Sequence, residues 1–65
     1  MNGIELLKIA LQEQVEILPK NFVSDNNIKV KYIGERFNPI NSSDLVKVYV
    51  IEEEGELNGK VVYQY

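Results

Sequence analysis

The spacing of hydrophobic residues changes once along the chain, at Pro19. Before Pro19, apolar residues recur every three or four positions, which places them on one face of a helix. They are Ile4, Leu7, Leu11, Val15 and Leu18. After Pro19, apolar and polar residues alternate, as in β-strands. We predict a helix over residues 3–18, because Asn2 is a good N-cap and Pro19 disfavours helical geometry at the residue before it.

Three strands are predicted after the helix. The first runs over residues 28–33 and continues to residue 37 with a bulge at Gly34, the second covers 45–53, and the third covers 60–64. Short polar segments separate these strands, so they form an antiparallel meander. The predicted fold is a single α+β domain over residues 1–65, with an N-terminal helix packed on a three-stranded antiparallel β-meander (α-β-β-β).

The second strand is apolar on both sides, which is typical of a central strand or of a strand whose second side is also covered. We predict that its valine side packs on the helix. This side of the sheet carries Val46, Val48, Val50, Val61 and Tyr63. The helix residues expected against it are Leu7, Leu11, Val15 and Leu18.

Two turn signals compete between the second and third strands, Glu54-Gly55 and Asn58-Gly59. A tight turn at either signal is compatible with the pattern, as is a wider loop over 54–59 that pairs Glu53 with Lys60. We favour the wider loop. The three registers differ by even numbers of residues, so each of them keeps the same side chains together on one side of the sheet.

The composition excludes most kinds of catalytic site. The 65 residues include no cysteine and no histidine, so thiolate and imidazole metal ligands and the commonest general base are absent. The serines lie in predicted loops with no histidine to activate them. Glutamates are dense only over residues 52–56, where we expect a solvated turn. We therefore predict that the protein is not an enzyme and has no cofactor or metal.

Protein binding is the function that the sequence favours. A chain of this size builds a small core, and its apolar residues exceed what three short strands can cover. We expect a homodimer that also binds another protein as a regulator or inhibitor; a structural subunit of an assembly is an alternative. The residues expected to contact a partner are Leu6, Ile9, Ile17, Leu45, Tyr49 and Ile51.

A second alternative is binding of RNA or single-stranded nucleic acid. Residues 28–51 hold four basic residues against two acidic ones, although the whole chain has a net charge of −3. Basic residues beside an aromatic side chain are typical of such surfaces. We expect the candidates to share one side of the sheet, its outer face; they are Lys29, Lys31, Lys47, Tyr49 and Lys60. The small number of basic residues makes nucleic acid the less favoured partner.

No segment resembles a signal peptide or a membrane span. The longest apolar-rich stretch, residues 4–18, is interrupted by charged residues and is shorter than the ~20 apolar residues that cross a bilayer. We therefore expect a cytoplasmic protein with no membrane partner.

Overall fold

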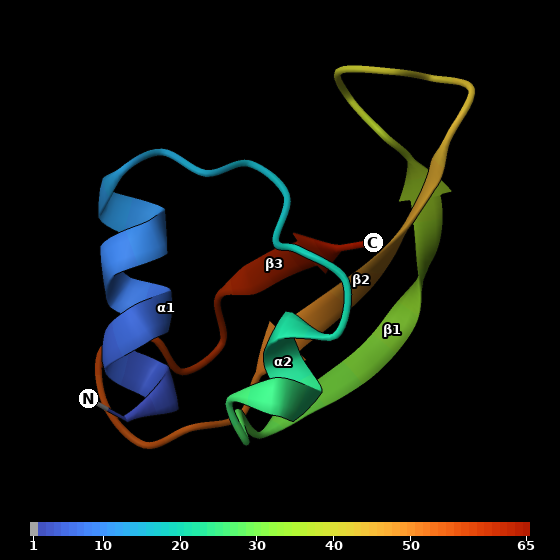
Figure 1. The fold of residues 1–65 in the computed structure, drawn as a ribbon. Helices are drawn as coiled ribbons and strands as arrows, with labels where there is room; N and C mark the ends of the chain where they lie inside the picture. Colours follow the sequence, from blue (N-terminus) through green and yellow to red (C-terminus); the bar gives the residue numbers. More distant parts are fainter. Residues whose placement is uncertain (1) are drawn as a thin grey trace.

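The computed structural model describes residues 2–65, which form two helices and three strands. In chain order these are α1 (Gly3–Gln12), α2 (Phe22–Asp25), β1 (Val30–Phe37), β2 (Leu45–Ile51) and β3 (Val61–Gln64). The strands form one antiparallel sheet in the order β1-β2-β3, and both helices pack on the same side of it (Figure 1). The predicted α+β fold is confirmed. The short helix α2 is an additional element that the alternation pattern did not predict.

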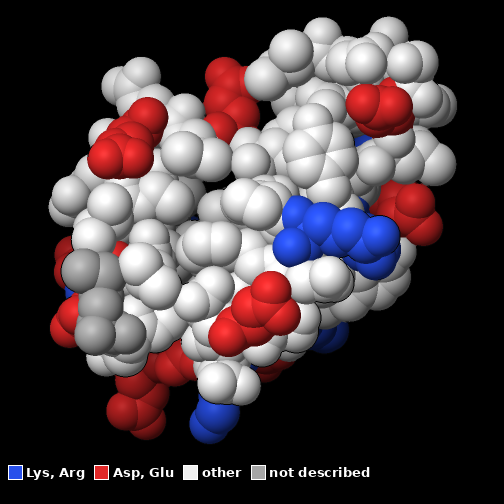
Figure 2. Space-filling view, viewed as in Figure 1, with Lys and Arg blue, Asp and Glu red and all other residues white. Residues whose placement is uncertain are grey.

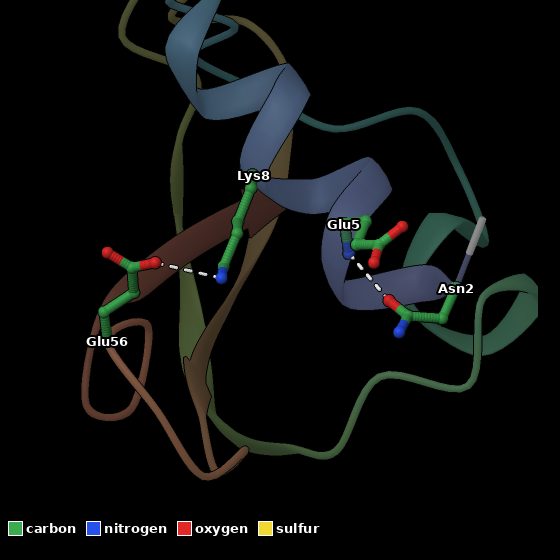
Figure 3. A network of polar contacts seen from close by, with 4 residues as sticks. All are labelled: Asn2, Glu5, Lys8 and Glu56. Carbon is green, nitrogen blue, oxygen red and sulfur yellow. Dashed lines mark hydrogen bonds and ion pairs between the residues drawn. The ribbon is translucent and has the colours of Figure 1, made fainter.

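The start of α1 follows the predicted capping pattern. The Asn2 Oδ1 atom accepts a hydrogen bond from the Glu5 backbone N–H at 2.9 Å (Figure 3). This bond satisfies one of the N–H groups that have no partner within the first turn of a helix. Glu5 also places a negative charge near the positive end of the helix dipole.

The helix α1 stops six residues short of the predicted end at residue 18, so the predicted length was wrong. Gln14 adopts a left-handed backbone conformation, with a φ of 60°. The Gln14 N–H donates to the Leu11 carbonyl and the Val15 N–H to the Ala10 carbonyl, both at 3.1 Å. These bonds form a Schellman motif, which ends a helix by satisfying its last carbonyl groups. The sequence did not indicate that α1 ends here, because glutamine replaces the glycine that is usual at the left-handed position after a helix.

Leu18 is buried, but it lies outside the helix. It forms an isolated parallel bridge with Gln64 of β3. The Leu18 N–H donates to the Tyr63 carbonyl at 2.8 Å, and the Leu18 carbonyl accepts from the Tyr65 N–H at 3.3 Å. The segment before Pro19 therefore covers part of the edge of β3, which would otherwise present unpaired backbone groups.

The pairing of β1 with β2 has one irregularity. Tyr32 lies opposite Tyr49 and Gly34 lies opposite Val48, so Ile33 has no partner on β2. This is the predicted bulge, and Gly34 has a φ of 146°, a conformation that favours glycine. We call the side of the sheet that carries the helices the inner side. The bulge changes which residues of β1 face it, from even-numbered before the bulge to odd-numbered after it.

The register between β2 and β3 differs from all three predicted alternatives. Val50 lies opposite Val61, two residues away from the register of the favoured wide loop. In the connection, Leu57 is buried in the core, and the Gly59 N–H donates to the Ile51 carbonyl at 2.8 Å. Because Leu57 is buried, the connection between β2 and β3 packs on the core. The predicted registers were based on turn-forming residues alone and did not include this packing. The shift is even, so the valines of β2 share one side with Val61, as predicted.

The sheet packs on the helices through the opposite side from the predicted one. The buried core consists of Leu7, Leu18, Val23, Ile28, Ile51, Leu57 and Val62. The inner side therefore carries the odd-numbered residues of β2, and Tyr49 lies half-buried against the core. The valine side faces away from the helices, together with Val61 and Tyr63. The predicted packing was wrong because β2 is apolar on both sides, so the alternation of apolar and polar residues could not show which side the helices cover.

A buried polar side chain joins α2 to the sheet. Gln64 is buried, and its Oε1 atom accepts a hydrogen bond from the Val23 backbone N–H at 2.8 Å. This N–H belongs to the first turn of α2, where backbone donors have no partner within the helix. Within residues 2–65, every buried side-chain nitrogen or oxygen has a hydrogen-bond partner.

An exposed ion pair links α1 to the connection between β2 and β3. The Lys8 Nζ atom lies 2.9 Å from the Glu56 Oε1 atom (Figure 3). The hydrogen bond from Lys8, and then its positive charge, lower the pKa of the Glu56 carboxyl below its usual value. The pair therefore contributes stability above the ordinary carboxyl pKa and loses it as the pH falls through the lowered pKa.

We expect the substitution Lys8→Met to raise the pKa of Glu56, because it removes the hydrogen bond and the charge but keeps a long unbranched side chain. Carbon-detected NMR titration of the Glu56 carboxyl measures this shift. Lys20→Met removes a lysine elsewhere on the exposed surface and is the matched control, which should leave the Glu56 titration unchanged. A Glu56 midpoint that is the same in wild type and Lys8→Met would contradict the ion pair.

Candidate interaction surfaces

The hairpin formed by β1 and β2 extends beyond the two helices (Figure 1). On its inner side, Phe37 is 62% exposed, Leu45 is 55% exposed and Tyr32 is 51% exposed. The register places Phe37 directly opposite Leu45, and Glu35 directly opposite Lys47. We call this uncovered part of the inner side the hairpin face. It consists of Tyr32, Glu35, Phe37, Leu45 and Lys47.

The hairpin face is apolar with one charge of each sign. The ring of Tyr32 packs edge-on against the ring of Tyr49, with 5.6 Å between the ring centroids. The Tyr32 hydroxyl lies 3.4 Å from a carboxylate oxygen of Glu35, to which it donates. Partial desolvation and then the Glu35 charge raise the pKa of Tyr32 above its usual value. The hydroxyl is therefore protonated at neutral pH.

The loop at the end of the hairpin is held in place by Asn38, which is buried. Its Oδ1 atom accepts from the backbone N–H groups of Ile40 and Asn41, at 2.8 and 3.3 Å. Its Nδ2 group donates to the Tyr65 hydroxyl at 2.9 Å. These bonds order the loop while the side chain of Ile40 at its tip stays 74% exposed. The loop thus adds a further apolar side chain beside the hairpin face.

The other side of the sheet, which we call the outer face, carries no helix. It consists of Lys31, Gly34, Arg36, Val46, Val48, Val50, Val61 and Tyr63. The Arg36 guanidinium lies over the Tyr63 ring, 5.2 Å from its centroid, and donates from Nη1 to the Tyr63 hydroxyl at 3.0 Å. Val46 lies opposite Arg36 and is buried although no helix covers it.

The residues predicted to contact a partner do not form one surface in the structure. They are Leu6, Ile9, Ile17, Leu45, Tyr49 and Ile51. Leu6 and Ile9 are exposed one turn apart on α1, and Leu45 belongs to the hairpin face. Ile17 is half-buried. Tyr49 is half-buried against the core, and Ile51 lies inside it at 1% exposure, so Ile51 is not accessible to a partner.

The residues predicted to bind nucleic acid are also dispersed. They are Lys29, Lys31, Lys47, Tyr49 and Lys60. Lys31 lies on the outer face, whereas Lys47 and Tyr49 lie on the inner side. Lys60 precedes β3 and lines a hollow beside α1. Lys29 precedes β1, where its backbone N–H donates to a Glu53 carboxylate oxygen at 2.8 Å. The predicted sharing of one sheet side was wrong, because residues 31 and 47 face opposite sides.

Tyr32 and Phe37 are exposed side chains that the sequence pattern did not single out. Their exposure follows from the position of the hairpin, whose far end extends beyond both helices (Figure 1). The core that the helices cover is built around the other end of the sheet, at Ile51 and Val62. The hydrophobic pattern carries no signal for how far the helices cover the sheet.

No metal site is present within residues 2–65. No group of three or more His, Cys, Asp or Glu side chains in this range is placed to hold a metal ion. A hollow of about 500 Å³ between the start of α1 and the turn after α2 is lined by two carboxylates, those of Asp25 and Glu53. No helix in this range has the length and apolar character needed to cross a bilayer.

The charges are spread thinly over the molecule. In Figure 2, acidic side chains are scattered over the face that is shown, a basic group lies right of its centre, and most of that face is uncharged. No family model, curated protein or solved structure matches the chain.

Proposed function

We propose that the protein is a small, non-catalytic protein-interaction module of the cytoplasm, which forms a homodimer and regulates or inhibits a second protein. The hairpin face is the observation that supports this most. Three large apolar side chains that are at least half exposed lie on one side of a projecting hairpin. Single exposed apolar residues are ordinary, but such a group on a projecting element is typical of an interaction site.

The side chains of the hairpin face are of the kind that anchors protein interfaces. Tyrosine is among the residues that contribute most to binding, and phenylalanine is enriched in the centre of interfaces. Tyr32 combines a large apolar ring with a hydroxyl that keeps a polar partner, so its burial leaves no polar group unsatisfied. Phe37 and Leu45 contribute apolar area without any polar atom. Burial of these three side chains would favour association.

The charges of the hairpin face suit a second copy of the same chain. Glu35 and Lys47 lie opposite each other across the two strands. In a two-fold symmetric contact, the same patch meets itself, so Glu35 of one copy can approach Lys47 of the other. Two such contacts form by symmetry, and no charge of the face is left against a like charge. The hairpin face is therefore complementary to itself in both polarity and charge.

The size of the hairpin face sets the expected strength of the dimer. Five residues and the loop tip are far fewer than the 20–30 residues that each partner contributes to a standard interface. Interfaces of this small size belong to weak and reversible complexes. We therefore expect a dissociation constant in the micromolar range, about 10–100 μM.

Sedimentation equilibrium over micromolar concentrations tests the dimer. We expect an average mass that rises with concentration from the 7.5 kDa of one chain toward twice that value. The double substitution Phe37→Ser and Leu45→Ser should keep the chain monomeric over the same range, because it removes the apolar anchors without touching the core. Leu6→Ser and Ile9→Ser remove two exposed apolar residues of α1 and are the matched control. A monomeric wild type, or a control as monomeric as the hairpin variant, contradicts this dimer.

Exchange of charges identifies which surfaces meet. Glu35→Lys gives a hairpin face with two positive charges, and Lys47→Glu gives one with two negative charges. We expect each variant alone to associate more weakly than wild type, and an equimolar mixture of the two to form a heterodimer. The same mixing experiment with Lys31→Glu and Glu54→Lys, whose charges lie outside the hairpin face, should give no such gain. Absence of the heterodimer would place the contact elsewhere.

Affinity capture from the native host tests the regulatory role. We expect the dimer-competent chain to retain a second protein in a fixed ratio and to change the activity of that protein in a purified assay. If the chain captures only its own copies, the regulatory part of the proposal is wrong, whereas the dimer is unaffected.

A further inference from the structure

The outer face is positively charged, whereas the chain as a whole is negatively charged. Its charged side chains, Lys31 and Arg36, are both basic, and no strand position on this side of β1, β2 or β3 carries a carboxylate. The whole chain has a net charge of −3. The ion pair described within residues 2–65 joins Lys8 and Glu56, so neither cation of the outer face is neutralised by a carboxylate of this range.

The Arg36 guanidinium is held in one orientation and keeps donors to spare. It stacks over the Tyr63 ring and uses one N–H on the Tyr63 hydroxyl. A guanidinium has five N–H donors in a fixed planar fork, which matches the geometry of a carboxylate. Because packing on the ring already restricts the side chain, binding of an anion would cost less rotamer entropy.

The floor between the two cations is flat and apolar. Lys31 lies opposite Val50, and Arg36 lies opposite Val46, four residues further along β2, so the α carbons of these two residues are about 13 Å apart along the strand direction. The Arg36 guanidinium itself reaches over the Tyr63 ring of β3. Gly34 lies between them opposite Val48 and has no side chain. A β carbon at Gly34 would meet no atom within 4 Å, so the place beside Val48 is open.

We propose that the outer face binds an extended acidic segment of another protein. Two carboxylates four residues apart in an extended chain are also about 13 Å apart and point to the same side, so one can meet Lys31 and the other Arg36. The residue midway between them points to the same side as well, and an apolar side chain there packs on Val48 beside Gly34. This inference rests on the proposed role as a protein-interaction module, and it names the kind of partner, but it uses a surface separate from the hairpin face.

Acidic peptide fits the outer face better than nucleic acid does. The face of the Tyr63 ring is already occupied by the Arg36 guanidinium, so this ring is not free to stack on a base. Two cations over a floor of valines provide few contacts for a run of phosphates, whereas an apolar floor suits a peptide side chain. The experiment must therefore distinguish binding of the acidic peptide from binding of a single-stranded oligonucleotide.

The probe is a fluorescent, terminally blocked peptide with two glutamates four residues apart, a valine midway between them, and serine or threonine elsewhere. Fluorescence anisotropy with the full chain should show saturable binding, and a peptide with glutamines in place of the glutamates should bind at least tenfold more weakly. We expect Lys31→Ala to weaken binding about threefold and Lys31→Glu about tenfold. Arg36→Lys keeps the charge but loses the planar fork, so it should weaken binding several-fold.

Two controls separate this inference from the proposed dimer. Lys47→Ala removes a lysine of the inner side and should leave peptide binding unchanged. The hairpin variant with Phe37→Ser and Leu45→Ser should bind the peptide as wild type does, even where it no longer dimerises. No peptide binding up to about 1 mM, equal binding by Lys31→Glu and wild type, or tighter binding of a poly-thymidine oligonucleotide would each overturn the inference. A failed dimer test would not contradict the inference that the outer face binds an acidic peptide.

Discussion

Replacement of Ile51 by alanine lowers the free energy of unfolding by about 2–5 kcal/mol, the range for truncation of a fully buried isoleucine. Ile51 is 1% exposed and packs in the core with Leu7 and Val62. A core of this size supplies about 3–5 kcal/mol in total, so most of the Ile51→Ala chains should be unfolded at room temperature. Urea or thermal unfolding followed by circular dichroism measures the loss.

Val48→Ala is the matched control for Ile51→Ala. Val48 lies three positions away on the same strand, but on the outer face, where it is half-buried. We expect it to cost about 1 kcal/mol, because its methyl groups are only partly removed from water. Both variants are compared at a concentration where the wild type is monomeric, since dimerisation shifts apparent stability. Equal costs, or a larger cost for Val48→Ala, would show that the valine side is the buried one.

Replacement of Gly3 by alanine is expected to destabilise the protein by about 1–3 kcal/mol, the usual cost of inserting a methyl group into a close-packed site. A β carbon at Gly3 would overlap the carbonyl oxygen of Asn26 and would lie 2.9 Å from the Asn26 β carbon. The Asn26 carbonyl oxygen belongs to the backbone of the turn after α2, so the whole turn must move to make room for a β carbon at residue 3. Helix propensity predicts the opposite sign, because alanine is favoured over glycine in a helix by about 1 kcal/mol.

The sign of the Gly3→Ala effect is therefore the informative result, and chemical denaturation measures it. Gln12→Ala, at the exposed end of the same helix, is the control and should change the free energy of unfolding by no more than about 0.5 kcal/mol. Stabilisation by Gly3→Ala would show that the start of α1 does not pack closely against the turn at Asn26.

Local features of the fold could be predicted because the signal and the structure lie within a few residues of each other. Asn2 and Glu5 mark the start of α1 through one hydrogen bond, and Gly34 marks the bulge in β1 through its backbone conformation. The end of α1 could not be predicted in the same way. Its left-handed residue is Gln14, and the apolar spacing continues to Leu18 although Leu18 is buried beside β3.

The presence of exposed apolar side chains was predictable, but their positions were not. The excess of apolar residues suggested a binding surface, and exposed apolar side chains are present on the hairpin. Of the predicted contact residues, however, Leu45 lies on the hairpin face while Ile51 lies in the core, although both are odd-numbered residues of β2 on the same side of the sheet. They differ because Ile51 lies at the end of β2 that joins the core, whereas Leu45 lies at the end of the hairpin that extends beyond the helices (Figure 1).

The order and type of the elements follow from the chain itself, because the periods of 3.6 and 2 residues act over short distances. The chain itself does not determine which side of the sheet is buried. Because β2 is apolar on both sides, the alternation of apolar and polar residues cannot show which side packs on the helices. Tertiary packing decided it: Ile51, Val62 and Leu57 lie in one buried core with Leu7 of α1. The exposed hairpin face follows from the same packing, since the helices cover the end of the sheet at Ile51 and Val62 and the hairpin extends beyond them (Figure 1).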